Sequence, residues 1–549
     1  MGQIKHYNNG TWTIYTSGED LSGYTSGTTN TYYLGINSTD GDFSKVNPDG
    51  TLIDLEEQSP TLQQVLDNNH DLVDGNNFQG TGAGNANTGT KVIAFGDDTA
   101  SGNTGTFVNA IGTQAAKGNT GGSVNSIGVD SANNNTGDNV NGYGEGSASS
   151  NQGDNVNAFG LNAANSNTGD NVNAFGENAA NGNNGDYVIA IGLDSARDNK
   201  TNGQYLVSVG LSAAQNNQGS GCVVLGTSSG FANSGDTLVA ISDNAGYENK
   251  GNYVIAIGAN SAMYNTGDTV NFIGYNAGMN NTNNFVNAIG AEAARQNTGE
   301  NTNAIGQNAG RQNTGNRLNA FGYNAGYLNK GNTVNAFGVQ SANDNKSGAD
   351  YVNAFGDSSA RLNQGNTVNA FGNNAGELNK GNTVNAFGGQ ASYQNYGNYV
   401  NSVGEGAAYQ NSGNNVNAIG YYAAQNNKGN NVSAIGYTSA YQNSGSSVNG
   451  FGDNSAVQNS GNYIIAIGDN AAQQNTGDDV ISIGRYAGVS NGLSGAFIIS
   501  NNNLPTYLNY SAATYTGSST TITIANGAVA GNTYLFYNET TQSIGAVRL

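Results

Sequence analysis

The sequence predicts an all-β protein, a parallel β-roll or β-solenoid of about 25 sixteen-residue coils. The phrase Val-Asn-Ala-Phe-Gly recurs along the chain, and its last residue, which we call the marker glycine, returns every 16 residues. An Asn lies seven residues after each marker position, and a Gly commonly follows two residues later. The 3 prolines all lie outside this repeat, as expected if a proline would remove a hydrogen bond between stacked strands.

The marker positions run from Gly96 to Gly484, with Ser242 replacing one glycine. Two steps are 18 residues long instead of 16, and their additional residues fall at the same turn, in segments 200–203 and 346–349. Insertions in a repeat protein belong in loops on one edge, so we expect both segments to protrude from the stack.

The Asn-x-Gly motif predicts a tight turn in every coil. Glycine supplies a positive φ, and asparagine tolerates the left-handed region and can bond to its own backbone. We expect structural turn and ladder roles for the asparagines and glycines of this pattern, exemplified by Asn103, Asn119, Asn135, Asn167, Asn475 and Gly169.

The segment before each marker glycine predicts a short strand. In residues 171–175, Val172 and Ala174 share one face, and Asn173 and Phe175 share the other. Both faces carry apolar side chains, which is typical of a strand buried on both sides. One coil has one interior, so we expect a sister chain to cover the second face.

The outward asparagines form a column with Asn173, at Asn109, Asn125, Asn141 and onward. We interpret this column as an amide ladder, with hydrogen bonds from coil to coil that keep its polar groups satisfied inside an interface.

The remaining part of each coil is rich in alanine, as in residues 162–166. We expect a second strand here, because small residues let two strands pack closely, and sixteen residues suit two strands and two turns. A flattened two-sided roll is therefore predicted, with a three-sided solenoid as the alternative. Two helices per coil are excluded by the frequent Gly, Asn and β-branched residues.

The ends of the chain differ from the repeat. Residues 1–60 contain the single Trp and two of the three prolines, and they predict an N-terminal attachment module. Residues 61–95 are expected to form a transition and a capping coil, with one helix over 59–68. Residues 96–492 are the predicted shaft. Residues 493–549 predict a small β tip or cap domain, with strands over 519–524 and 534–537.

Composition restricts the partners. The net charge is −21 and only 10% of residues are charged, which disfavours nucleic acid and anionic membranes as partners. No apolar stretch resembles a signal peptide or a membrane span, so we expect no membrane insertion. The single cysteine, Cys222, occupies a valine position of its coil, so we expect it to be a core residue.

The sequence offers little for catalysis, and we expect no enzyme activity, no cofactor and no metal. His6 and His70 both lie outside the coils, so the shaft has no Ser-His-Asp triad. Two carboxylates could still cleave a glycan. The shaft candidates are turn residues that we interpret as solvated, namely Asp138, Asp170, Asp186 and Glu177.

Three tyrosines, Tyr393, Tyr409 and Tyr441, share one coil position. Exposed aromatic rings can stack on sugars, so these residues are candidate glycan contacts. An inert rim or a contact between sister chains remains the alternative.

The alternation of Val-x-Ala-Ile/Phe-Gly with an alanine-rich second segment, over roughly residues 80–492, resembles the head repeats of YadA-type trimeric autotransporter adhesins. That resemblance implies a left-handed parallel β-roll that associates as a homotrimer. The period here is longer, and Asn173 and Asn287 stand where that family usually has valine. The chain also lacks a heptad stalk and a C-terminal barrel, which disfavours an autotransporter.

An N-terminal module, a long β-shaft and a small C-terminal β-domain together look like a phage tail fibre or a related injection-machine fibre, and residues 1–12 are similar to the openings of such proteins. The resemblance implies a trimeric virion tail fibre, made in the host cytoplasm and acting extracellularly. Its N-terminus would dock to a baseplate or tail protein, and its C-terminal end would bind a host-surface glycan or protein. The alternatives are a shaft that itself binds glycans and, less favoured, a tailspike-like glycan depolymerase.

Overall fold

The computed structural model describes residues 75–500 continuously, together with eight further strands nearer the two ends of the chain. Every regular element in the described residues is a β-strand, and none is a helix. The chain divides into two units, Met1–Asn183 and Asn184–Leu549, each of which is described by itself.

The first unit begins with two small antiparallel sheets. The first pairs β1 (Ile4–Asn8) with β2 (Thr11–Tyr15), and the second has the order β3 (Tyr33–Ile36), β4 (Phe43–Val46), β5 (Leu52–Asp54). A parallel stack follows, in which each strand pairs with the next. Its strands are β6 (Asn77–Gln79), β7 (Val92–Phe95), β8 (Val108–Ile111), β9 (Val124–Ile127), β10 (Asn141–Tyr143), β11 (Asn157–Phe159) and β12 (Asn173–Phe175).

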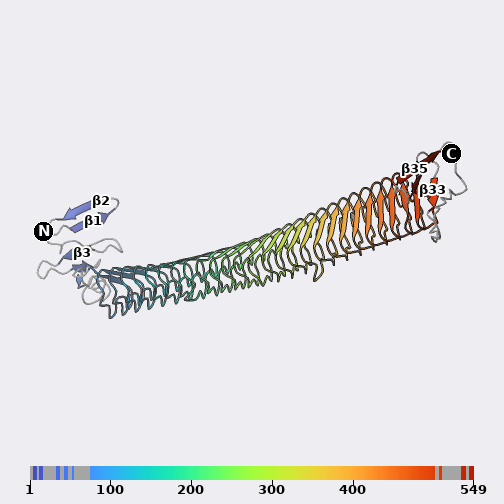
Figure 1. Ribbon diagram of the computed structural model, residues 1–549. Helices are drawn as coiled ribbons and strands as arrows, with labels where there is room; N and C mark the ends of the chain where they lie inside the picture. The colour runs from blue at the N-terminus through green and yellow to red at the C-terminus, as the bar shows by residue number, and fades with distance from the viewer. Residues whose placement is uncertain are drawn as a thin grey trace. The chain divides into compact units, whose positions relative to one another are not determined.

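The second unit is a longer parallel stack of the same kind, drawn from green to red in Figure 1. Its strands are β13 (Val188–Ile191), β14 (Leu206–Val209), β15 (Val223–Leu225), β16 (Leu238–Ile241), β17 (Val254–Ile257), β18 (Val270–Ile273), β19 (Val286–Ile289), β20 (Thr302–Ile305), β21 (Leu318–Phe321), β22 (Val334–Phe337), β23 (Val352–Phe355), β24 (Val368–Phe371), β25 (Val384–Phe387), β26 (Val400–Val403), β27 (Val416–Ile419), β28 (Val432–Ile435), β29 (Val448–Phe451), β30 (Ile464–Ile467), β31 (Ile481–Ile483) and β32 (Ala496–Ile499). The predicted parallel β-solenoid of sixteen-residue coils is therefore confirmed within each unit.

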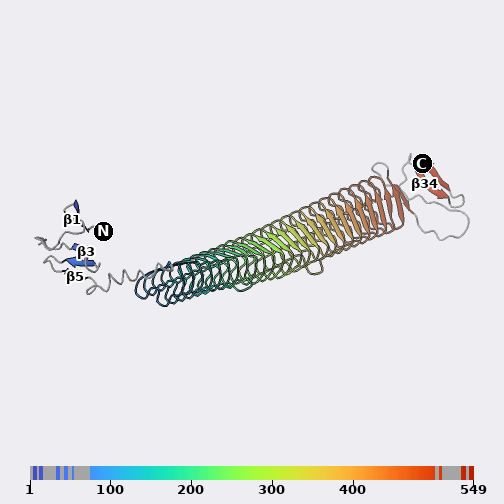
Figure 2. The same cartoon turned by 90° about the vertical axis from the view of Figure 1, so that its left-hand side faces the viewer.

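The register keeps equivalent residues in columns. Val384 pairs with Val400, sixteen residues later, and the pattern repeats from strand to strand. Where a coil has two additional residues the column is kept, since Asn335 pairs with Asn353. The additional residues lie in exposed loops, visible in Figure 2 as two loops that protrude from the edge of the stack, as predicted for segments 200–203 and 346–349.

One face of every strand forms the interior. In β27, Val416 and Ala418 are fully buried, whereas Asn417 and Ile419 are exposed. The alanine-rich segment packs against the buried face, because a methyl group added at Gly246 would touch the side chains of Leu238 and Ala240. We call the alanine-rich side of each coil, which follows the marker glycine, the turn side. The strand and the turn side together enclose one thin core. None of residues 75–500 covers the outward face of the strands, whose side chains are half-buried or exposed.

The turn side is not a strand, contrary to our expectation. Its alternate residues take left-handed backbone conformations, as at Gly406 (φ 65°), Ala408 (φ 52°) and Gln410 (φ 54°). The N–H groups of successive left-handed residues bond to opposite neighbours: Ala408 donates to Ala423 of the following coil, and Gln410 donates to Tyr393 of the preceding coil. The backbone is therefore paired along the stack without the extended geometry of a second strand.

The last strand of the stack is closed by β33 (Thr506–Asn509), which runs antiparallel to β32. A separate hairpin pairs β34 (Thr533–Asn538) with β35 (Ser543–Arg548), so the strand expected over 534–537 is present. The predicted strand over 519–524 and the predicted helix over 59–68 lie outside the described residues.

Candidate functional site

The most extensive candidate surface is the outward face of the strands, which we call the outer sheet face. It consists of the residue before each strand and of the outward residues within the strand. Large apolar side chains on this face are exposed: Tyr463 by 66%, Tyr399 by 62% and Ile419 by 44%. Because apolar side chains in such a continuous row are unusual on an isolated soluble chain, the face is a candidate interface.

The predicted amide ladder runs through the outer sheet face. In the first unit Asn109 donates to Asn125 at 2.8 Å and Asn125 donates to Asn141 at 2.7 Å. The ladder continues to Asn173 at 2.8 Å from Asn157. In the second unit it links ten consecutive coils, at Asn271, Asn287, Asn303, Asn319, Asn335, Asn353, Asn369, Asn385, Asn401 and Asn417.

Apolar columns flank this ladder. Five phenylalanine rings stack between β21 and β25 with centroids 4.8–4.9 Å apart and nearly parallel planes. These rings are half-buried or exposed, and they belong to Phe321, Phe337, Phe355, Phe371 and Phe387. Isoleucines occupy the same position in other coils, such as Ile289 and Ile419. The face therefore combines stacked apolar side chains with amides that are already hydrogen-bonded.

A second ladder of asparagines lies inside the stack and holds the turn that precedes each strand. Asn119 donates to Asn103 at 2.8 Å and to the carbonyl of Gly121 at 2.8 Å, and it is completely buried. Asn135, Asn167 and Asn475 repeat these bonds, and Gly169 donates to and accepts from Asn167. The predicted structural role of these residues is visible in the geometry of every such coil.

The tyrosines of the turn side do not form one continuous column. Tyr393 and Tyr409 stack at 5.0 Å between ring centroids. Tyr441 lies two coils beyond Tyr409, with Gln425 at the intervening position. Burial and the nearby Glu377 carboxylate raise the pKa of the Tyr393 hydroxyl above its usual value. A sugar bound at Tyr393 and Tyr409 would contact two stacked rings, whereas Tyr441 is separated from them by one coil.

Three of the four shaft carboxylates that could have served catalysis have structural partners. Asp138 accepts a hydrogen bond at 2.7 Å from the backbone of Gly122, and Asp170 accepts one at 2.8 Å from Asp154. Asp186 accepts from Gln204 at 3.4 Å, and Glu177 is exposed. Each of these aspartates therefore helps link one coil to the next.

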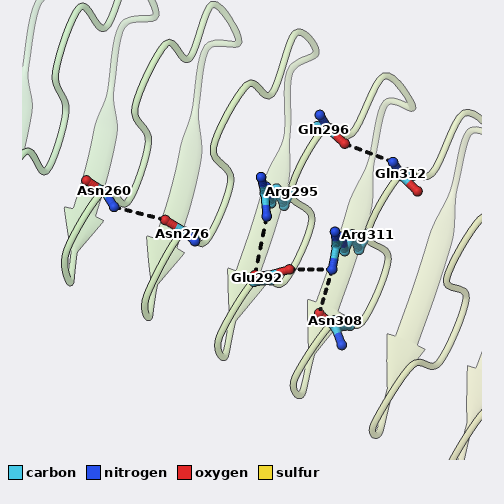
Figure 3. Close-up of polar contacts among 8 residues, drawn as sticks. All are labelled: Asn260, Asn276, Glu292, Arg295, Gln296, Asn308, Arg311 and Gln312. Carbon is cyan, nitrogen blue, oxygen red and sulfur yellow. Dashed lines mark hydrogen bonds and ion pairs between the residues drawn. The ribbon is translucent and has the colours of Figure 1, made fainter.

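The turn side carries one cluster that the sequence analysis missed. Arg295 and Arg311 occupy the coil position of the tyrosines in consecutive coils, and both point toward Glu292 (Figure 3). Arg295 Nη1 lies 3.3 Å from the Glu292 carboxylate, and Arg311 forms an ion pair with the same group. Gln312 donates to Gln296 at 2.9 Å beside them. The sixteen-residue spacing of two arginines at one coil position was the signal for this cluster.

Cys222 is buried in the core, as predicted from its valine position. Burial is the main cause that raises the pKa of its thiol from 9.0 to about 11, so the group is protonated at neutral pH. Within residues 75–500 and the other described strands, no group of three potential metal ligands comes together. No helix of that part of the chain is long and apolar enough to span a bilayer.

The sequence and the structure were compared with known proteins. No family model, no curated protein and no solved structure matches this chain.

Proposed function

We propose that the chain is the shaft-forming subunit of a homotrimeric attachment fibre, in which sister chains cover one another's outer sheet face. The observation that carries the proposal is the exposure of a continuous apolar face on a well-packed stack, as at Ile289 (43%) and Phe387 (42%). The amides within this face already bond to one another, so burying them leaves few polar groups unsatisfied.

The size of the face supports association. The second unit alone has twenty stacked strands. Strands about 4.8 Å apart and roughly 13 Å long give this stack an outward face of about 1,200 Å². A specific protein interface buries about 600–1,000 Å² on each partner, and a trimer divides the face between two neighbours, so the second unit alone offers about 600 Å² to each.

The fibre role rests on the resemblance of the sequence to phage tail fibres and on the repeat itself. Each coil adds about 4.8 Å along a parallel stack, so the number of coils sets the distance that the shaft spans. We assign the N-terminal residues to docking on a virion baseplate or tail protein. We assign the C-terminal end to a host-surface glycan or protein. The fibre acts outside the cell, and we propose no catalytic activity for it.

The mass of the intact assembly in native buffer tests the proposal. We expect three times the chain mass of 56.0 kDa. Phe355→Asp places a charge in the middle of the stacked rings and should reduce the mass toward that of one chain. Tyr409→Asp disturbs a comparable stack on the turn side and should leave the mass unchanged. A wild-type chain that is monomeric at micromolar concentration would contradict the proposal.

A shaft that binds glycans is the second candidate. The stacked pair Tyr393 and Tyr409 supports it, because aromatic rings are frequent sugar platforms. Replacing both by alanine would then weaken binding to host-surface glycans. The depolymerase alternative predicts release of reducing ends from such glycans, and loss of that release when the shaft carboxylates are replaced.

A further inference from the structure

The charge balance around Glu292 differs from that of the other ion pairs in the described residues. Arg361 pairs with Glu377, Arg485 pairs with Asp469, and Arg197 has two carboxylate partners. At Glu292 two guanidinium groups share one carboxylate. The cluster therefore carries a surplus positive charge on a chain whose net charge is −21.

The hydrogen-bonding capacity of the two arginines is also incompletely used. The Nε–H groups of Arg295 and Arg311 make no hydrogen bond, but both atoms are buried, so a ligand would meet the Nη groups. Apart from Glu292, the acceptor within reach of a guanidinium is Asn308, 3.4 Å from Arg311 Nη1. One shared carboxylate cannot accept from every Nη–H of two half-buried guanidinium groups, so the remaining Nη donors can bind a further acceptor.

Groups that suit a sugar surround the arginines. Gln296 and Gln312 form an exposed amide pair, which can exchange hydrogen bonds with hydroxyl groups. Arg311 lies over the ring of Tyr327, 5.8 Å from its centroid.

We propose that Arg295 and Arg311 form a binding site for a carboxylate-bearing sugar on the turn side of the shaft. A planar carboxylate accepts two parallel bonds from a guanidinium, a geometry that lysine does not offer. Tyr327, which lies against Arg311, offers its ring to the apolar face of the sugar, and the glutamines bond to the sugar hydroxyls. A densely charged polyanion is disfavoured by the negative charge of the chain, so the ligand carries few carboxylates.

The site is independent of the proposed trimer. Its residues come from the turn side, whereas the proposed chain contacts lie on the outer sheet face. A monomeric protein would contradict the fibre proposal and leave this site available for the same measurement.

Titration calorimetry on the full-length protein with digalacturonate tests the site. We expect saturable binding, at least tenfold weaker for the neutral dimethyl ester, because the ester has no charged acceptor. The Arg295→Gln and Arg311→Gln double variant should bind digalacturonate at least tenfold more weakly. Arg361→Gln removes an arginine from the same coil position and should change the affinity less than twofold.

A second double variant, Arg295→Lys with Arg311→Lys, keeps both positive charges beside Glu292. It provides a test even if the Arg295→Gln and Arg311→Gln double variant does not fold. It should lose at least fivefold in affinity because the bidentate geometry is lost. A wild-type protein that does not bind digalacturonate, or a double variant that binds it as well as wild type, overturns the proposal. Binding of a sulfated disaccharide alone overturns the assignment of a carboxylate.

Discussion

The side chain of Asn411 donates a 2.9 Å hydrogen bond to the Oδ1 of Asn395, its counterpart in the preceding coil. Its second amide hydrogen goes to the carbonyl of Gly413 at 2.7 Å. Its own oxygen accepts from Asn427 and from the backbone of Gly413. The fully buried side-chain amide of Asn411 therefore uses both of its N–H donors and both acceptor positions of its oxygen. Only asparagine supplies this set of bonds here, which explains why every coil of the repeat has an Asn at this position.

We expect Asn411→Ala to destabilise the shaft by about 2–4 kcal/mol, because it leaves the Gly413 carbonyl and the neighbouring amides without partners. Asn417→Ala is the matched control, since that residue ends the outer ladder and accepts a single ladder bond, from Asn401, so its loss should cost less than about 1 kcal/mol. Hydrogen exchange of the amides in the adjacent coils measures both effects. Equal protection in the two variants would show that the internal ladder contributes no more than the outer one.

We expect Gly404→Ala to prevent normal stacking of its coil. The residue has φ 126°, and an added Cβ would lie 2.5 Å from the carbonyl oxygen of Gly420 in the next coil. Gly348→Ala is the control, because Gly348 also has a positive φ (85°) but nothing lies within 4 Å of the added methyl group. The control should cost about 1 kcal/mol. Urea denaturation followed by circular dichroism distinguishes a steric effect at Gly404 from a purely conformational one.

We expect Glu377→Gln to reduce stability by about 2 kcal/mol, because it leaves the half-buried Arg361 guanidinium without its charged partner. Asp469→Asn breaks a comparable ion pair to Arg485 that is well exposed, so it should cost less than about 1 kcal/mol. Thermal unfolding at low and at high salt provides the measurement. A loss at Glu377 as small as that at Asp469 would contradict the prediction.

The buried thiol of Cys222 should make the free energy of unfolding depend on pH above pH 9. Burial raises the pKa of its thiol from 9.0 to about 11, so between these values the folded chain keeps a proton that the unfolded chain releases. The free energy of unfolding therefore falls as the pH rises from 9 to 11, by up to roughly 1.4 kcal/mol per pH unit. Cys222→Val should remove this contribution. The thiol should also react with an aromatic disulfide reagent at pH 8 only after denaturation.

Comparison of the sequence with the structure shows where sequence reasoning succeeded. The sixteen-residue return of the marker glycine predicted the parallel register, because stacked strands place equivalent residues beside each other, as Val384 and Val400 are. The outer amide ladder and the buried Val416–Ala418 face followed from the two-residue period of a strand.

The turn side was predicted incorrectly as a second strand. Alanine is compatible with several backbone conformations, and nothing in residues such as Ala408 signals a left-handed φ. That conformation is imposed by the neighbouring coils, which require the N–H groups of Ala408 and Gln410 to point in opposite directions along the stack. The arginine cluster was missed for a related reason, because a shared carboxylate at Glu292 depends on side chains from two coils meeting.

The sequence by itself determined the period, the strand of each coil and the residues that stack in columns, because these follow from local turn chemistry and side-chain alternation. Only the tertiary structure decided the backbone of the turn side, the opposite directions of the two amide ladders and the grouping of Arg295 with Arg311. These features depend on hydrogen bonds and charges between residues of neighbouring coils, whose geometry exists only after the coils have stacked.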